Sequence, residues 1–249
     1  MHTTKHDSAL RDAKASADTP FFSANSALSE RELIVTASEL ATPSQATNEL
    51  LTRVRDIAIA ASMLFVLFPV MVLAALCIAI SSPGPIVFKQ TRVGMNGRGF
   101  GCYKFRSMRT DAEEHLASLI ETRAELRHEW NCNHKLSRDP RITPIGRILR
   151  HSSIDELPQL INVIRGDMSL VGPRPIVSSE VPKYGRYITS YFSVRPGLTG
   201  LWQVTGRNNS SYRRRVAADV LYSRSRSMWF DFKILFMTIP AVITGQGSC

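Results

Sequence analysis

The longest hydrophobic run of the chain extends from Ile57 to Ile80 and contains no charged residue. A run of about 24 residues is long enough for a helix to cross the hydrocarbon core of a bilayer. The run therefore predicts that this protein works at a membrane. A spanning helix is usually oriented by an excess of Lys and Arg on one flank. Here basic residues stand on both flanks, at Arg53, Arg55, Lys89 and Arg92.

Pro69, near the middle of the run, is the predicted membrane break. A proline inside a helix removes one backbone hydrogen bond and clashes with the preceding turn, so it can bend the helix into a re-entrant hairpin. Both ends would then lie on the same side of the membrane. Proline is also tolerated in ordinary spanning helices, and the residues by themselves leave both arrangements open.

The pattern after the run predicts short elements of both kinds. Asn96-Gly97 is typical of a β-hairpin turn, with Ile86 to Phe88 and Phe100 to Met108 as its strands. Apolar residues near the helical period predict one helix from Thr110 to about Trp130. Thr110 would open it in a capping box with Glu113.

Further helices are predicted at Pro144 to Arg150 and at Ser153 to Ile164, the second opened by a capping box of Ser153 and Glu156. Met168 to Val177 is expected to be a strand or extended segment. Glycines in Val194 to Arg207 indicate a loop of the kind that lines a site. The last predicted helices are Tyr212 to Arg226 and Trp229 to Ile243, and the second of these would lie flat at the membrane interface.

Composition limits the domain organisation. With 249 residues and 44% hydrophobic content, the chain can form one sizeable core. Residues 1–50 are rich in Ala, Ser, Thr and Asn, which predicts a mostly disordered tail with one helix near Ser29 to Leu40. The four cysteines form no C-x-x-C pair, which argues against a zinc site or a disulfide framework. A net charge of +10 indicates an anionic partner: nucleic acid, anionic lipid or a phosphorylated substrate.

Three acidic clusters lie among the arginines and are candidates for a catalytic role. They are Asp111 with Glu113 and Glu114, Asp139, and Asp155 with Glu156 and Asp167. Glu113 and Glu156 could have a purely structural role, in which each carboxylate accepts hydrogen bonds from backbone amides at a helix start. Carboxylates flanked by many arginines suit phosphoryl transfer. Arginines can hold phosphate oxygens, and a carboxylate can attack phosphorus or hold Mg²⁺. The sequence contains no P-loop, no H-E-x-x-H and no G-x-S-x-G motif.

Four long motifs occur in one order: YKFRSM at Tyr103 to Met108, the stretch from Asp139 to Pro175, PGLTGLWQVTGR at Pro196 to Arg207, and DFKILFMTIPAV near the end. Together they resemble the bacterial sugar transferases, which are monotopic phosphoglycosyl transferases, over roughly residues 50 to 246. The subgroup most resembled is the exopolysaccharide undecaprenyl-phosphate galactose phosphotransferases.

The resemblance implies an α+β fold on the cytoplasmic face of the bacterial inner membrane. Residues 1–50 would be the tail and 51–85 a re-entrant membrane helix. Residues 86–249 would be a small, mostly helical catalytic domain that lies on the membrane, with a short β-hairpin and interfacial amphipathic helices. Family members often carry Ser-Pro at the helix break, whereas this chain has Phe68-Pro69.

The resemblance also implies an Mg²⁺-dependent reaction. A carboxylate attacks the sugar-bearing phosphate of a UDP-hexose, either galactose or glucose, UMP leaves, and the phosphosugar passes to undecaprenyl phosphate. This is the first step of exopolysaccharide or O-antigen repeat-unit synthesis.

Carried over onto this chain, the nucleophile is Glu113, with Glu114 as metal or proton-handling partner and Asp111 as the alternate. The family's usual pair is Asp-Glu, so Glu113 departs from it. Glu113 and Glu114 are also the predicted metal ligands. The expected phosphate-binding residues are Lys104, Arg106, Arg141, Arg147, Arg150 and Arg174, and the carboxylates expected to support them or the bound metal are Asp139, Asp155 and Glu156.

Two other functions remain as alternatives: a membrane-anchored nucleic-acid-binding protein, and a scaffold without catalysis. Against the first, aromatic and basic residues do not interleave as a stacking platform requires. The expected partners are therefore UDP-hexose, undecaprenyl phosphate and membrane lipids, without nucleic acid, and a homo-oligomer is left open.

Overall fold

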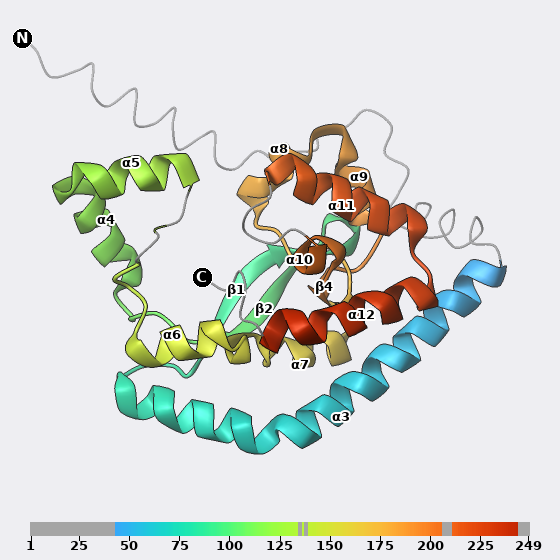
Figure 1. Ribbon diagram of the computed structural model, residues 1–249, viewed down its shortest axis with the longest axis horizontal. Helices are drawn as coiled ribbons and strands as arrows, with labels where there is room; N and C mark the ends of the chain where they lie inside the picture. The colour runs from blue at the N-terminus through green and yellow to red at the C-terminus, as the bar shows by residue number, and fades with distance from the viewer. Residues whose placement is uncertain (1–42, 134–135, 137–138, 206–210, 244–249) are drawn as a thin grey trace, which may run out of the picture. The chain divides into compact units, whose positions relative to one another are not determined.

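Residues 43–133, 136, 139–205 and 211–243 are described by the computed structural model (Figure 1). Residues 1–46 and 47–249 form separate units, and the second contains the hydrophobic core. The predicted tail, apart from its last residues, and the helix predicted near Ser29 to Leu40 lie outside the described residues.

Helix α3 (Pro43–Ser81) contains the hydrophobic run. It is the one helix of the described residues that is long and apolar enough to cross a membrane. Its apolar side chains are widely exposed, as at Phe65 and Ile80, both 85% exposed. The helix continues through Pro69, and Figure 1 shows that it changes direction along its length. The re-entrant hairpin remains a prediction.

The predicted β-hairpin is confirmed. Strand β1 (Val87–Val93) pairs antiparallel with β2 (Gly99–Phe105). The turn contains the short helix η1 (Met95–Gly97). Both residues of the Asn96-Gly97 pair have positive φ, 58° and 72°. Asn and Gly adopt that backbone most readily, which is why this dipeptide closes the hairpin.

The single helix predicted from Thr110 is wrong. Two helices, α4 (Ala112–Thr122) and α5 (Ala124–Asn133), are separated by an extended residue. The N-cap is Asp111, without a side-chain cap, so Glu113 lies one position earlier than the capping box requires. The guanidinium of Arg127 donates to the carbonyls of Ile120 and Glu121, which satisfies the end of α4 and stabilises the break.

Helix α6 (Pro144–His151) is confirmed, with the Thr143 hydroxyl accepting from the Gly146 amide at 2.9 Å. The helix predicted from Ser153 to Ile164 is wrong in its first half and confirmed from Gln159 onward. Ser153 has φ 57° and caps nothing, and a 3₁₀ turn, η2 (Ile154–Glu156), comes before α7 (Gln159–Arg165). Pro158 explains the difference, because it has no N–H and clashes with the preceding turn. Asp155 and Glu156 therefore lie in a short turn between two helices.

Strand β3 (Ser169–Val171) pairs parallel with β4 (Gly197–Thr199). The extended segment predicted there is confirmed, and the predicted glycine-rich loop contains β4 and α10 (Leu201–Thr205). The backbones of the two segments approach closely at Gly197, where an added Cβ would lie 2.1 Å from the Gly172 nitrogen. Only glycine fits at that contact.

The remaining elements include the two predicted C-terminal helices, α11 (Tyr212–Ser225) and α12 (Met228–Ile243), which are confirmed as helices. Before them come η3 (Ser178–Glu180), α8 (Val181–Tyr184), η4 (Gly185–Tyr187) and α9 (Ile188–Phe192). On α12, Trp229 is 80% and Phe236 78% exposed, whereas Asp231 and Ile234 are buried. Its interfacial placement remains a prediction.

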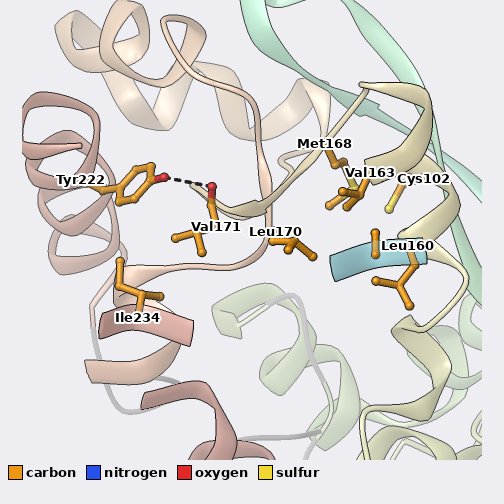
Figure 2. Packing of buried hydrophobic residues seen from close by; sticks show 9 residues of the cluster. Cys102, Leu160, Val163, Met168, Leu170, Val171, Tyr222 and Ile234 are labelled. Carbon is orange, nitrogen blue, oxygen red and sulfur yellow. Dashed lines mark hydrogen bonds between the residues drawn. The ribbon is translucent and has the colours of Figure 1, made fainter. Parts of the chain in front are cut away.

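One hydrophobic core joins elements far apart in the sequence (Figure 2). Its buried members come from α3, β2, α7, the segment before β3, β3, α11 and α12: Ala60, Cys102, Leu160, Val163, Met168, Leu170, Val171, Tyr222 and Ile234. The single O–H of Tyr222 lies between two acceptors, the Val171 carbonyl at 3.0 Å and Oδ1 of Asp231 at 2.8 Å. The first part of α3 is therefore packed into the domain.

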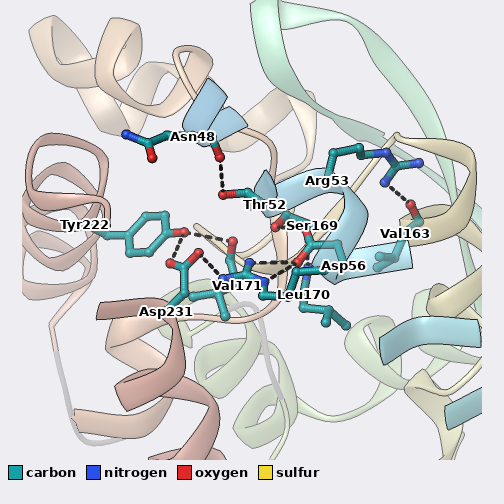
Figure 3. Close-up of polar contacts among 11 residues, drawn as sticks. Asn48, Thr52, Arg53, Asp56, Val163, Ser169, Leu170, Val171, Tyr222 and Asp231 are labelled. Atoms are coloured by element: carbon teal, nitrogen blue, oxygen red, sulfur yellow. Dashed lines mark hydrogen bonds and ion pairs between the residues drawn. The ribbon is translucent and has the colours of Figure 1, made fainter. Parts of the chain in front are cut away.

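Buried charges fasten the same part of α3 (Figure 3). Arg55 pairs with Asp56 at 2.7 Å and with Asp231 of α12 at 2.8 Å. Asp56 also accepts from the Ser169 hydroxyl. Arg53 donates to the carbonyls at the end of α7. The arginines before the hydrophobic run thus bind groups of the protein itself. Buried charges are tolerated there because they are paired.

Candidate active site

A cleft of about 1100 Å³ brings the predicted site residues together. Its walls come from both strands of the hairpin, β1 and β2, from helices α4, α6, α10, α11 and α12, from η2, and from the segments after α3, β2 and β3 and before α6. The predicted charged residues that line it are Lys104, Arg106, Asp111, Glu113, Glu114, Asp139, Arg141, Arg150, Asp155, Glu156 and Arg174. Arg147 is exposed on α6 and does not line it.

Glu156 lies between two cations of this cleft. Its Oε1 is 2.6 Å from Lys104 Nζ and 3.6 Å from Arg174 Nη1. Burial acts to raise the pKa of Glu156, but the charges of Lys104 and Arg174 outweigh it and hold the pKa at about 2. Glu156 is therefore ionised throughout the physiological range and keeps both cations in position.

Asp155 is buried beside it, with 7% of its surface exposed. Burial raises the pKa of Asp155 to about 6; Lys104 opposes this, and the negative charge of Glu156 adds to it. At pH 7 the carboxyl group is still mostly ionised, and it is more basic than an ordinary aspartate. A perturbed carboxylate in a cationic cleft is typical of a catalytic site.

The acidic residues of α4 have a different environment. Glu113 and Glu114 are exposed in its first turn, at the rim of the cleft. Asp111 forms an ion pair with Arg109 at 2.9 Å, and this hydrogen bond lowers the pKa of Asp111. Glu113 and Glu114, predicted to carry the chemistry, thus lie at the rim, whereas Asp155 and Glu156, two of the three carboxylates predicted to support it, lie among the cations.

Two predicted phosphate ligands are already engaged by the protein. Arg106 is buried and donates to the carbonyl oxygens of Ser82 and Pro83 at 2.6 and 3.0 Å, so it holds the end of α3. Arg141 is buried, pairs with Asp139 at 2.6 Å, and stacks over Trp130. Both line the cleft through side chains that also hold its walls.

The cleft also contains residues that the sequence did not single out: Arg92, Trp202, Gln203 and Arg215. Trp202 and Gln203 belong to the glycine-punctuated segment predicted to line a site, and that signal could have identified them. Arg215 is one of several arginines on α11, and no local signal distinguishes it from its neighbours.

The metal prediction has limited support from side chains alone. Among the described residues, no group of three or more His, Cys, Asp or Glu side chains could hold an ion. Mg²⁺ is usually bound by only one or two carboxylates together with substrate phosphates. A cleft lined by both exposed and buried carboxylates fits that mode of binding.

The chain is similar to several proteins of known name. It is 44% identical to the UDP-galactose-lipid carrier transferase of Erwinia amylovora, over 81% of this chain and 42% of that protein. It is also 44% identical to the exopolysaccharide production protein ExoY of Rhizobium meliloti, over 76% of this chain and 84% of that protein.

The UDP-glucose:undecaprenyl-phosphate glucose-1-phosphate transferase of Escherichia coli is 38% identical, over 80% of this chain and 41% of that protein. The chain thus spans about two fifths of the length of the Erwinia and Escherichia relatives. The family described as bacterial sugar transferase matches residues 47–245. This match confirms the resemblance seen in the motifs, and the chain belongs to the bacterial sugar transferase family.

Proposed function

We propose that this chain transfers hexose 1-phosphate from a UDP-hexose, galactose or glucose, to undecaprenyl phosphate, with release of UMP. This would start the synthesis of an exopolysaccharide or O-antigen repeat unit. The observation that carries the proposal is the cleft near the end of the exposed apolar helix α3, where Lys104 and Arg174 flank adjacent carboxylates. The names of the relatives support the same substrates.

The reaction proceeds as two displacements at one phosphorus atom. A carboxylate oxygen attacks the sugar-bearing phosphorus, the bond from that phosphorus to the bridging oxygen breaks, and UMP leaves with that oxygen. A phosphate oxygen of undecaprenyl phosphate then attacks the same phosphorus and displaces the carboxylate. The products are UMP and the lipid diphosphate sugar, and the free carboxylate is restored. Cations that hold the first diphosphate can hold the second.

Asp155 fits the role of nucleophile better than the predicted Glu113. It lies beside the cations that would hold the phosphates, and its raised pKa makes it a stronger base while leaving it ionised at pH 7. Glu156 would keep Lys104 and Arg174 aligned. Glu113 is exposed at the rim and remains the alternative nucleophile.

We propose that one or two carboxylates of the cleft would hold Mg²⁺ when the donor is bound. Glu113 and Glu114 remain the predicted ligands, since they lie at the rim. The ion would offset the negative charge of the diphosphate. The protein's own cations, Lys104 and Arg174, which also line the cleft, would act on the same charge.

The membrane arrangement belongs to this proposal. We place residues 51–85, which include most of α3, in the membrane as a re-entrant hairpin. Residues 86–249 would lie on the cytoplasmic face of the inner membrane, with α12 at the interface. The exposed apolar side chains of both helices support this placement. Thr47→Cys and Lys89→Cys, each made in a cysteine-free chain, should react with an impermeant maleimide from the same side of membrane vesicles. Labelling from opposite sides would contradict the hairpin.

The activity is tested with a panel of UDP-sugars, assayed for UMP release with undecaprenyl phosphate and Mg²⁺. UMP release with UDP-galactose or UDP-glucose is expected, and intact mass should detect a phosphosugar on the protein when the lipid is omitted. The absence of UMP release with every UDP-hexose would refute the proposal. An inactive scaffold would also carry no adduct.

A further inference from the structure

Arg215 of α11 lines the cleft together with Trp202 of α10. Its side chain is 13% exposed, and Nη1 lies 3.2 Å from Glu180 Oε1. Its guanidinium lies 5.4 Å from the centre of the Trp202 ring and 5.2 Å from that of Tyr212. A carboxylate and two aromatic rings therefore hold the guanidinium in one orientation.

The other edge of this guanidinium lacks a hydrogen-bond acceptor. Nε and Nη2 of Arg215 are buried without a partner, and Nε1 of Trp202 is buried without one beside them. Buried donors in folded proteins are almost always paired, because an unpaired one loses its hydration without compensation. Several unpaired donors in one cluster that lines a cleft indicate an acceptor that binds there.

Other buried arginines use their guanidinium groups within the protein. Arg55 pairs with two aspartates, Arg106 donates to carbonyls at the end of α3, and Arg141 pairs with Asp139. Arg92 donates from Nε and Nη2 to Gln90 and from Nη1 to the Pro175 carbonyl. In the part of the chain that the structure describes, Arg215 alone among the arginines has buried nitrogens without a partner.

Two further cations, Arg92 and Arg174, line the cleft together with Arg215. Burial, and then the neighbouring charge of Arg174, lowers the pKa of Arg92, and Arg215 acts in the same direction. Arg174 and Arg215 thus both lie close enough to Arg92 to disfavour its charge, whereas burial of Arg215 is outweighed by Tyr184 and Glu180, which raise its pKa. Nε and Nη2 of one guanidinium form a parallel fork that matches two oxygens of a phosphate group. An anion with paired oxygens would satisfy the two buried donors of Arg215.

We propose that Arg215 is a phosphate-binding residue of the cleft, with its Nε and Nη2 edge facing two oxygens of one phosphate group and the Trp202 N–H as an additional donor. This inference rests on the proposed function, in which the phosphate belongs either to UDP-hexose or to undecaprenyl phosphate. Glu180 and the aromatic rings position the guanidinium for either one.

The test measures binding without turnover, using the full chain in lipid nanodiscs. The dissociation constants of UDP and of farnesyl phosphate are determined by isothermal titration calorimetry for the wild type and Arg215→Lys. Lysine keeps the charge and loses the fork. The matched control is Arg214→Lys, the same change at the exposed neighbour on α11. Trp202→Phe removes the N–H and keeps a smaller aromatic ring beside the guanidinium.

Arg215→Lys should raise the dissociation constant of UDP, of farnesyl phosphate or of both at least tenfold, and the affected ligand identifies the source of the phosphate. Arg214→Lys should stay within twofold of the wild type. Unchanged binding of both ligands by Arg215→Lys, or a wild type that binds neither, would overturn the proposal. If thermal melting shows that Arg215→Lys is unfolded, Trp202→Phe decides: a threefold or greater loss supports the site, and unchanged binding overturns it.

UMP release is measured on the same wild-type preparations. Its absence with every UDP-hexose counts against the proposed function, whatever the binding data show. Normal UMP release together with unchanged binding by a folded Arg215→Lys counts against the phosphate site alone.

Discussion

Replacing Asp155 with Asn should abolish activity while stabilising the folded protein. The substitution keeps the size of the side chain and removes the ionised oxygen proposed to attack phosphorus. Loss of a covalent nucleophile typically lowers kcat/KM by roughly 10⁴-fold or more. The matched control is Glu113→Gln, the same chemical change at an exposed residue on the rim of the cleft.

The stability effect follows from the pKa of Asp155. A rise from 3.8 to about 6 means that holding this buried carboxylate ionised costs the folded state about 3 kcal/mol at pH 7. Between pH 4 and pH 6 the folded protein binds more protons than the unfolded chain, so stability falls as pH rises through this window. Asparagine carries no charge and avoids the cost. The variant should therefore melt at a higher temperature above about pH 6, and the gain should disappear near pH 4.

The wild-type pH profile provides a second check. Activity should rise about tenfold per pH unit below about pH 6 and level off above it, because only ionised Asp155 attacks. UMP release is measured from pH 5 to 8 for the wild type and both variants, and thermal melting is followed at pH 4.5 and 7.5. The reasoning is refuted if Asp155→Asn retains more than a tenth of wild-type kcat/KM, or if Glu113→Gln loses as much as Asp155→Asn. A lower melting temperature for Asp155→Asn at pH 7.5 would refute the electrostatic part.

Three further substitutions test the packing around the cleft and the role of one of its cations. Gly146→Ala should lower the free energy of unfolding by about 2 kcal/mol, since its Cβ would lie 1.9 Å from the Ser107 carbonyl oxygen; denaturant titration measures this. Tyr222→Phe should lower it by about 1–3 kcal/mol, because the buried carboxylate of Asp231 loses a donor at 2.8 Å; thermal melting measures this. Lys104→Met should raise KM for UDP-hexose roughly tenfold or more through the lost charge on the diphosphate, which steady-state UMP release measures.

Each of these has a result that would contradict it. Wild-type stability of Gly146→Ala would mean that α6 moves freely against the end of β2. Wild-type stability of Tyr222→Phe would mean that water replaces the hydroxyl. An unchanged KM for Lys104→Met would remove this lysine from the phosphate site.

Local rules were enough to identify several elements from the sequence. The length of the charge-free run predicted α3 as a membrane helix candidate, the Asn96-Gly97 pair predicted the hairpin, and the helix predicted from Pro144 is α6. In each case the deciding interactions lie within a few residues: a turn backbone, a cap, or a continuous apolar stretch. The four motifs likewise identified the family without a structure.

The roles of individual charged residues required the tertiary structure. Glu156 looked like a capping residue, but Pro158 prevents the helix, and its partners Lys104 and Arg174 come from other elements. Arg106 was predicted to bind phosphate and is engaged at the end of α3, whereas Arg215 looked ordinary and has buried, unpaired nitrogens.

The sequence by itself determined that the chain has a long apolar helix, a short hairpin and many cations near carboxylates. Only the folded structure decided which carboxylate is buried among the cations and which is exposed at the rim. The physical reason is that the pKa and the pairing of a charge depend on its burial and on neighbours far away in the chain, and neither is encoded in the residues next to it.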